Sequence, residues 1–113
     1  MKKKKKKNIG RKDDKGKPPV TQFLRQFPKA IKYLAKLSEY GHNTYGAEED
    51  NDAWDNWKKV ENAKFRYEQA GGRHALEEGG PIDESGFKHV AHAAWNFIAV
   101  LELELEDEEQ ISI

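Results

Sequence analysis

Two histidines and an asparagine stand at a helical spacing toward the C-terminal end of the chain. His89 and His92 are three residues apart, and Asn96 follows four residues after His92. In a helix, residues three and four apart lie on one face, so both imidazoles can reach the same metal ion or phosphate group. Apolar residues flank this polar stripe on both sides, although a buried polar group without a partner costs about 1–3 kcal/mol. We therefore favour a stripe that faces a ligand over histidines that only hydrogen-bond a neighbouring helix.

A pair of arginines forms a second group of candidates. Arg66 and Arg73 are seven residues apart, which places them on one face of a helix with the small Ala70 between them. Two guanidinium groups across such a gap can clamp a triphosphate. A solvated basic face would show the same pattern, and the sequence favours neither interpretation. His74 lies on the adjoining helix face.

Carboxylates that could complete a metal site lie in three segments. Asp83 and Glu84 come directly before the histidine-bearing segment, where they complement the positive end of a helix dipole. Glu39 lies in an earlier helical segment. A loop-like stretch holds the remaining candidates, Glu48, Glu49, Asp50, Asp52 and Asp55. Carboxylate oxygens suit magnesium or manganese, but we expect most of the loop acids to be solvated only.

Helices are needed to position these residues. Apolar spacing predicts a helix that begins at Pro28, a residue suited to the first turn, and ends at Gly41. A second helix is predicted over about residues 55–78. The pair Gly71-Gly72 in its interior costs roughly 1 kcal/mol per glycine relative to alanine. Such a pair indicates the close approach of another helix or of a ligand.

The last predicted helix carries the histidines. Its expected N-cap residue is Asp83, Glu84 or Ser85. The run "LELELED" alternates like a strand, but it follows an apolar helical pattern without a break, so we expect it to continue the helix with its glutamates exposed. No other segment is convincing as a strand. The predicted fold is therefore all-α, a small bundle of three to four helices.

Composition and charge limit the classes of protein that fit. The chain has 113 residues, of which 36% are apolar and 35% charged, and no cysteine, so we expect one domain with a small core and no disulfide or thiolate metal site. Residues 1–19 are rich in lysine and lack periodicity, which predicts a disordered basic tail and linker before a single helical domain over residues 20–113. No aromatic residue is interleaved with these lysines, so we do not expect nucleic-acid binding. No stretch approaches the roughly 20 apolar residues of a membrane span, and we expect a cytoplasmic protein.

Six short blocks occur along the chain in a fixed order: "RKDDKGKP", "YGHNTYG", "NW", "RYEQAGGRH", "DESGFKHVAHAAWN" and "LELE". Over about residues 11–105 they resemble a small phage-associated family, the dATP/dGTP diphosphohydrolase N-terminal domain. The most specific block is the fifth, with its D-x-S/E-G, H-x-x-H and N series. This family is similar, more distantly, to the all-α MazG-type nucleoside triphosphate pyrophosphohydrolases. Those enzymes hold magnesium with E-x-x-E on one helix and E-x-x-D on another, and they release pyrophosphate.

The resemblance implies a metal and nucleotide site. Against the MazG-type pattern E-L-A-D-x-x-x-N this chain reads H-V-A-H-A-A-W-N, so His89 and His92 take the places of two carboxylates, and Asn96 matches. We expect a divalent metal, magnesium or manganese as the family implies, or zinc as imidazole ligands allow. The expected metal ligands are Glu39, Asp83, His89 and His92. His74 and Glu84 are the catalytic candidates, and Lys17, Asn56, Arg66, Arg73 and Asn96 are the substrate-binding candidates.

Two functions are compatible with these residues. The first is a phage-encoded nucleoside triphosphate pyrophosphohydrolase that acts on dATP or dGTP in the host cytoplasm and releases pyrophosphate. The alternative is a non-catalytic, sponge-type phage protein that sequesters a host signalling nucleotide, which the missing carboxylate pairs favour. In either case the last helix is apolar on two faces, more than one small core can bury, so we expect a homodimer or a larger homo-oligomer.

Overall fold

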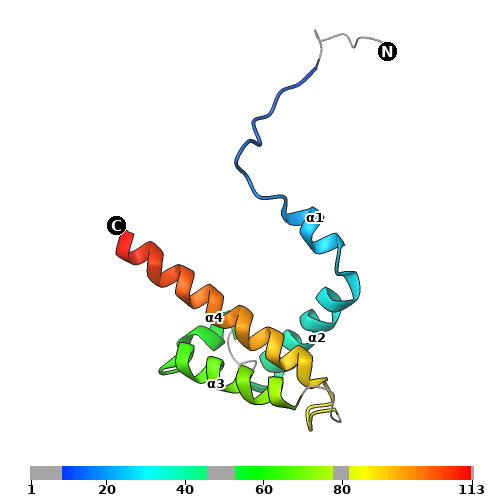
Figure 1. Ribbon diagram of the computed structural model, residues 1–113, viewed down its shortest axis with the longest axis vertical. Helices are drawn as coiled ribbons and strands as arrows, with labels where there is room; N and C mark the ends of the chain where they lie inside the picture. Colours follow the sequence, from blue (N-terminus) through cyan, green and yellow to red (C-terminus); the bar gives the residue numbers. More distant parts are fainter. Residues whose placement is uncertain (1–8, 46–52, 78–81, 113) are drawn as a thin grey trace.

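The computed structural model describes residues 9–45, 53–77 and 82–112 (Figure 1). Within these ranges the chain forms four α-helices, one 3₁₀-helix and no strand. The elements are α1 (Val20–Arg25), α2 (Pro28–Tyr45), η1 (Ala53–Lys59), α3 (Ala63–Leu76) and α4 (His89–Ser112). No helix in the described ranges has the length and apolarity needed to cross a lipid bilayer. The prediction of a small all-α fold is confirmed.

Helices α3 and α4 lie side by side and run antiparallel, and we call this pair the α3–α4 hairpin (Figure 1). Near the start of α3, Lys64 Nζ lies 3.6 Å from Asp107 Oδ2 toward the end of α4. Near the end of α3, His74 contacts His89 at the start of α4. The pairing of opposite ends establishes the antiparallel direction. It also brings residues far apart in the sequence to one place.

At Gly71 the ring of Phe97 from α4 packs directly against the backbone of α3. A Cβ atom at Gly71 would lie 2.9 Å from Cζ of Phe97, closer than such contacts occur without a shift. At Gly72, by contrast, a Cβ atom would meet nothing within 4 Å. The prediction that the glycine pair marks a close helix approach is therefore confirmed for Gly71. At Gly72, no contact within the described residues requires a glycine.

The core of the described residues is small and is built from small side chains. Its buried apolar residues are Leu37 on α2 and Ala91, Ala93 and Ala99 on α4. Three alanines on one helix allow neighbouring backbones to approach closely, but each removes little apolar surface from water. The larger contribution comes from aromatic residues at the edge of the core.

Three aromatic rings from three elements contact one another next to the hairpin. Trp57 of η1, Tyr67 of α3 and Trp95 of α4 have ring centroids 5.6–5.9 Å apart in edge-to-face arrangements. The hydroxyl of Tyr67 donates a hydrogen bond of 2.7 Å to the backbone carbonyl of Trp57. Burial raises the pKa of this phenol above its ordinary value. Edge-to-face pairs add about 0.5–1.5 kcal/mol beyond area burial, so this aromatic cluster holds η1 to the hairpin.

The predicted end of the first long helix at Gly41 is wrong, because α2 continues to Tyr45. Contacts on either side of the glycine account for the difference. Tyr40 packs against Phe87 at 5.6 Å between centroids, and His42 stacks on Trp54 at 4.2 Å. These tertiary contacts outweigh the roughly 1 kcal/mol cost of a glycine inside a helix.

The prediction of one continuous helix over residues 55–78 is also wrong. The segment forms η1, then a turn over residues 60–62, and only then α3. At the turn Asn62 has φ 59° and ψ 39°, in the left-handed region. Asparagine tolerates this conformation better than most residues because its side chain is short and polar. The break at Asn62 turns η1 back so that Trp57 can reach the hairpin.

The expected N-cap of the last helix is wrong as well, since α4 begins at His89 and Asp83, Glu84 and Ser85 lie in the preceding loop. The expected continuation of this helix is confirmed. Residues 101–107, the "LELELED" run, are helical within α4. A strand would have needed a partner strand, whereas the helix satisfies its own backbone groups.

The N-terminal arm, residues 9–32, contrasts with the hairpin. Residues 9–19 form no helix or strand, as predicted for a linker, while residues 1–8 of the predicted tail lie outside the described residues. Helix α1 and the first turn of α2 lead away from the hairpin (Figure 1). No residue of α1 is buried.

Candidate functional site

Residues 83–87, which lie shortly before α4, fold into a defined turn. The N–H of Ser85 donates a 2.8 Å hydrogen bond to Oδ1 of Asp83, and the N–H of Gly86 donates to the Asp83 carbonyl at 2.8 Å. The N–H of Phe87 donates to Oγ of Ser85 at 3.2 Å. Gly86 has φ +92°, a conformation that side chains rarely adopt. The sequence Asp-x-Ser-Gly thus forms a side-chain-stabilised turn that holds Asp83 in place.

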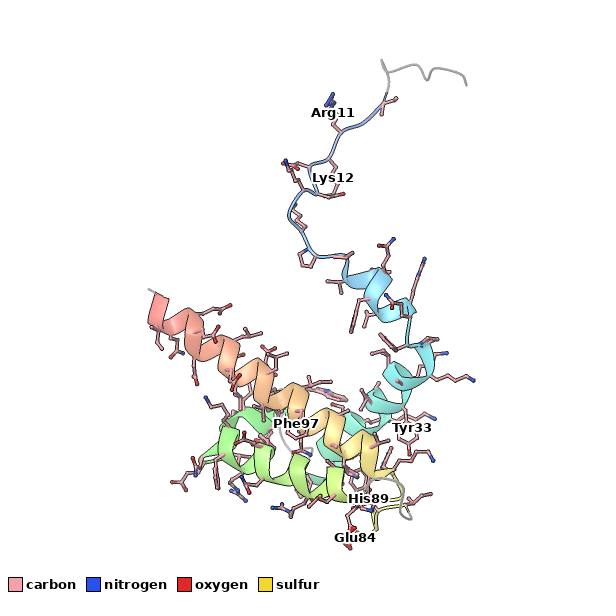
Figure 2. The ribbon with its side chains drawn as sticks, viewed as in Figure 1. Arg11, Lys12, Tyr33, Glu84, His89 and Phe97 are labelled. Atoms are coloured by element: carbon pink, nitrogen blue, oxygen red, sulfur yellow. The ribbon has the colours of Figure 1, made fainter. Side chains whose placement is uncertain are left out.

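Helix α2 supports this loop through aromatic contacts. The ring of Phe87 lies 5.5 Å from that of Tyr33 and 5.6 Å from that of Tyr40. The N–H of Lys88 donates a 3.0 Å hydrogen bond to the hydroxyl of Tyr33. Figure 2 shows Tyr33 on α2 beside the first turn of α4, where His89 lies. The start of α4 is therefore fixed from two sides, by α3 and by α2.

Three histidines meet where α3 ends and α4 begins. Nδ1 of His74 lies 2.9 Å from Nδ1 of His89, and the two rings are tilted by 37°. The ring of His92 stacks on that of His74 at 4.5 Å with only 14° between the planes. Nε2 of His92 lies 2.9 Å from Oγ of Ser85. We call His74, Asp83, His89 and His92 the histidine cluster.

Asp83 contributes the only carboxylate of the histidine cluster. One ligand atom each of His74, Asp83 and His89 lies within 4.8 Å of the others, and all three residues are partly buried. Oδ1 of Asp83 lies 3.6 Å from Nε2 of His92, too far for a hydrogen bond. These distances bring Asp83, His74 and His89 into range of one small ion.

The surroundings of His74 and His92 favour neutral imidazoles, and those of Asp83 favour an ionised carboxylate. Burial lowers the pKa of His74 below its ordinary value, against the opposing charge of Asp83. Burial also lowers the pKa of His92, and the neighbouring His74 adds to this effect. The backbone N–H of Ser85 holds the pKa of the Asp83 carboxyl below its usual range. At neutral pH these pKa directions favour free lone pairs on His74, His92 and Asp83.

The donor set fits a borderline transition metal better than magnesium. Two imidazoles and one carboxylate are the kind of ligands that zinc, manganese or iron accept, whereas magnesium prefers oxygen ligands alone. Three protein ligands with one position left open are typical of catalytic zinc sites. His74, Asp83 and His89 are thus a group of side chains that could hold such an ion, whereas the predicted ligand set contained His92 and Glu39 in place of His74.

The other predicted metal and catalytic residues lie elsewhere. Glu39 is exposed on α2. Glu84 is exposed at the outer edge of the loop (Figure 2). Asn96 is buried, at 8% exposure, but its Nδ2 donates a 2.8 Å hydrogen bond to the His92 carbonyl of its own helix. Asn96 thus lies on the stripe predicted from the sequence, with its amide directed to the helix backbone.

The predicted phosphate contacts are spread over several elements. Arg66 and Arg73 are exposed on α3, and Arg73 is close enough to His74 for its charge to lower the pKa of that imidazole. Asn56 is half-buried on η1, and Lys17 is exposed before α1. No hydrogen bond or ion pair within the described ranges joins either residue to the histidine cluster. Of these four, Arg73 lies nearest to the cluster.

Sequence reasoning missed the residues that hold the cluster together. Ser85 was considered only as a helix cap, yet it contacts Asp83, Phe87 and His92. The signal was present in the sequence, because aspartate followed two residues later by serine and then glycine is typical of a tight turn. The role of Tyr33 had no local signal, since it lies 55 residues from its partner Lys88.

Comparison with known proteins supplies the family. No curated protein and no solved structure matches the chain. Residues 7–112 match the family described as "dATP/dGTP diphosphohydrolase, N-terminal". This match covers nearly all of the 113 residues, in agreement with the resemblance read from the six sequence blocks. The chain therefore belongs to the dATP/dGTP diphosphohydrolase, N-terminal family.

Proposed function

We propose that this protein is a nucleotide diphosphohydrolase that converts dATP or dGTP and water to the deoxynucleoside monophosphate and pyrophosphate. The observation that carries the proposal is the family match over residues 7–112. The histidine cluster supports it, because hydrolases commonly combine imidazoles with a carboxylate where a metal and a water must be held. In this reaction the bond between the α-phosphorus and its bridging oxygen breaks, and the oxygen of water takes its place.

The residues around the cluster suggest how a triphosphate would be held. Arg73 and Arg66 lie on one face of α3, both exposed, and Arg73 directly precedes His74. Guanidinium groups bind phosphate oxygens through paired hydrogen bonds. A metal ion held by the cluster would neutralise phosphate charge and activate water. The triphosphate would then extend from the cluster along the arginine face of α3, with the purine beyond it.

One observation favours the alternative, a nucleotide-binding protein without catalysis. The cluster contains a single carboxylate, Asp83, while Glu39 and Glu84 are exposed elsewhere. Binding a nucleotide requires phosphate contacts but no activated water. A sponge-type protein could therefore use Arg66, Arg73 and the imidazoles alone.

The deciding experiment is a pyrophosphate-release assay on the purified protein. We expect release from dATP or dGTP in the presence of manganese or zinc, and loss of release in His89→Gln. His42→Gln is the matched control, since His42 is a histidine of α2 that stacks on Trp54 outside the cluster. Tight nucleotide binding by calorimetry without release would support the sponge instead. Neither release nor binding across a panel of purine deoxynucleotides would contradict both functions.

A further inference from the structure

We propose that His74, Asp83 and His89 are the ligands of a borderline divalent transition metal, with zinc as its best representative, and that His92 positions this trio without binding the metal. This ligand set differs from the helical pair His89 and His92 that sequence spacing predicts. The metal would serve the proposed hydrolase. The inference nevertheless rests on geometry, so metal binding without hydrolysis would leave it standing.

The first argument is the convergence of His74 and His89. Their Nδ1 atoms lie 2.9 Å apart, which for two neutral rings requires one to donate a proton and the other to accept it. Two nitrogen ligands of a tetrahedral zinc ion, at about 2.0–2.1 Å each, lie roughly 3.3 Å apart. A small opening of the pair, with the shared proton moved through solvent from Nδ1 to Nε2 of the donor ring, therefore suffices to admit an ion. The Asp83 carboxylate is within the same 4.8 Å group.

The second argument excludes His92 from the same ion. A ring nitrogen binds a metal along its lone pair, which lies in the plane of the ring. The rings of His74 and His92 are stacked, with 14° between their planes, so their lone pairs run in nearly parallel planes and do not converge. The rings of His74 and His89 are tilted by 37°, and their nitrogens face each other.

The third argument gives His92 a different role. Its Nε2 contacts Oγ of Ser85 at 2.9 Å, and Ser85 in turn fixes Oδ1 of Asp83 through its N–H at 2.8 Å. The face of the His92 ring covers His74. His92 thus supports two of the three ligands, one by stacking and one through the loop. Residues that orient metal ligands typically change metal affinity by about 10–100-fold when removed.

The test is a zinc titration of the full chain after treatment with a chelator, with a competing chromogenic chelator as the readout. We expect one zinc ion per chain. His74→Gln and His89→Gln should each weaken zinc binding by more than about 100-fold, and His92→Gln by about 10-fold, as for an orienting residue. His42→Gln should bind as the unchanged protein does. Magnesium should not compete.

Two further measurements keep the result interpretable. Circular dichroism establishes that each variant is folded, and zinc should raise the melting temperature of the unchanged protein but not of His89→Gln. Cobalt substituted for zinc should show a visible absorption band of a low-coordinate site, lost in His74→Gln. If His92→Gln removes zinc binding while His74→Gln retains it, the helical pair is the true ligand set. Absence of zinc binding by a folded, unchanged protein would also overturn the proposal.

A separate observation carries a second inference, about a partner. Helix α1 and the short connection after it present an exposed apolar stripe at 41–59% exposure, which we call the α1 stripe: Val20, Phe23 and Leu24 of α1, and Phe27 just beyond it. The outer face of α4 presents another, Ile98, Leu101 and Leu105, at 46–56% exposure. These α1 and α4 stripes lie apart in one copy, with α1 on the arm and the second half of α4 extending in another direction (Figure 1).

The charges around the two stripes are complementary. The arm, residues 9–32, carries seven basic and two acidic residues, whereas residues 101–112 carry six acidic residues and no basic one. On its inner side α4 already pairs with Lys58 and Lys64 through Glu106 and Asp107. Glu102 and Glu104 flank the exposed stripe on the helical wheel, and Glu102 lies near enough to Lys58 for its charge to raise the pKa of that amine.

We infer that the α1 stripe of one copy covers the α4 stripe of a second copy. In a two-fold dimer this contact occurs twice, so both stripes of both copies are covered. We infer a second copy as the partner because each chain carries both surfaces, an apolar stripe in a basic segment and an apolar stripe in an acidic segment. Within one copy these two stripes do not contact each other (Figure 1).

Light scattering coupled to size exclusion tests this dimer. The unchanged protein should be a dimer at micromolar concentration. Its dimer dissociation constant should rise at high salt, because salt screens the attraction between the basic and acidic segments. Leu101→Lys and Phe23→Glu should each give a monomer. Leu76→Lys, at a residue 89% exposed on α3, is the matched control and should stay dimeric. A monomeric unchanged protein, or a dimer that survives both stripe variants, would overturn the inference.

Discussion

Around the α3–α4 hairpin, aromatic side chains of α3, α4 and the adjoining η1 contact one another, whereas those of the N-terminal arm are largely exposed to solvent. Trp57, Tyr67 and Trp95 form the aromatic cluster. Phe23 and Phe27 of the arm contact each other at 5.4 Å but remain 58% and 45% exposed. The two regions therefore use the same residue types in different ways. In a single copy, the hairpin supplies the folding stability and holds the candidate site, while the arm has apolar surface left for a partner.

The largest expected effect is that of Trp95→Ala. Removing this ring from the aromatic cluster should cost about 3–5 kcal/mol of unfolding free energy, the usual range for a large aromatic residue in a packed site. Phe23→Ala in the arm should change the free energy of the monomer by less than about 0.5 kcal/mol. Urea denaturation of both variants, in the monomeric Leu101→Lys background, measures the difference. An equal loss of unfolding free energy in Trp95→Ala and Phe23→Ala would mean that Phe23 is packed within its own copy, contrary to this comparison.

A smaller effect should distinguish the two adjacent glycines of the hairpin. Gly72→Ala should stabilise the protein by about 0.5–1 kcal/mol, because alanine favours the helix and meets nothing there. At Gly71 the added Cβ would meet Phe97 at 2.9 Å, and overpacking costs about 1–3 kcal/mol. Because both variants gain the same helix propensity, we expect Gly71→Ala to be less stable than Gly72→Ala by this overpacking cost, about 1–3 kcal/mol.

The Gly71 comparison has an internal control. In a Phe97→Ala background the ring is gone, so the two glycine variants should become nearly equal in thermal denaturation. A difference that persists without the ring would show that contacts other than Phe97 limit the approach of the two helices.

Tyr67→Phe removes one hydroxyl from the aromatic cluster and keeps the ring. The lost hydrogen bond to the Trp57 carbonyl should cost about 1 kcal/mol. Tyr45→Phe is the matched control, because Tyr45 is 77% exposed at the end of α2 and should be neutral. Chemical denaturation measures the stability of both variants. An unchanged denaturation midpoint for Tyr67→Phe would mean that water hydrogen-bonds the Trp57 carbonyl as favourably as the Tyr67 hydroxyl does.

The smallest effect is expected at the far end of the arm. A chain that begins at Asn8 lacks the lysine run of residues 2–7. Because charge attraction is screened over about 8 Å at physiological salt, we expect this chain to keep its unfolding free energy and its nucleotide affinity. Calorimetric titration with dATP or dGTP at physiological salt measures the affinity. A loss of binding on removal of residues 1–7 would place the tail in the site.

The sequence by itself determined the position of α2, the continuation of α4 and the lack of regular structure before α1, because apolar spacing and turn residues specify these features locally. Helical apolar spacing predicts α2 and α4, Pro28 marks the start of α2, and the glutamate-rich run continues α4 because no turn residue interrupts it. The shared face of His89 and His92 follows from their spacing alone. The arm lacks periodicity before α1, and residues 9–19 are accordingly without regular structure.

Only the tertiary structure decided which side chains meet. Helix α2 passes through Gly41 because Tyr40 and His42 have partners elsewhere in the chain. His74 joins His89, 15 residues away, because α3 packs against α4 in an antiparallel hairpin. The spacing of His89 and His92 places both rings on one face of a helix, but only the packing of α3 against α4 brings His74 to them, where it stacks on His92. Periodicity specifies which face of a helix a residue occupies, but the direction of a ring and the identity of its neighbour depend on packing between helices.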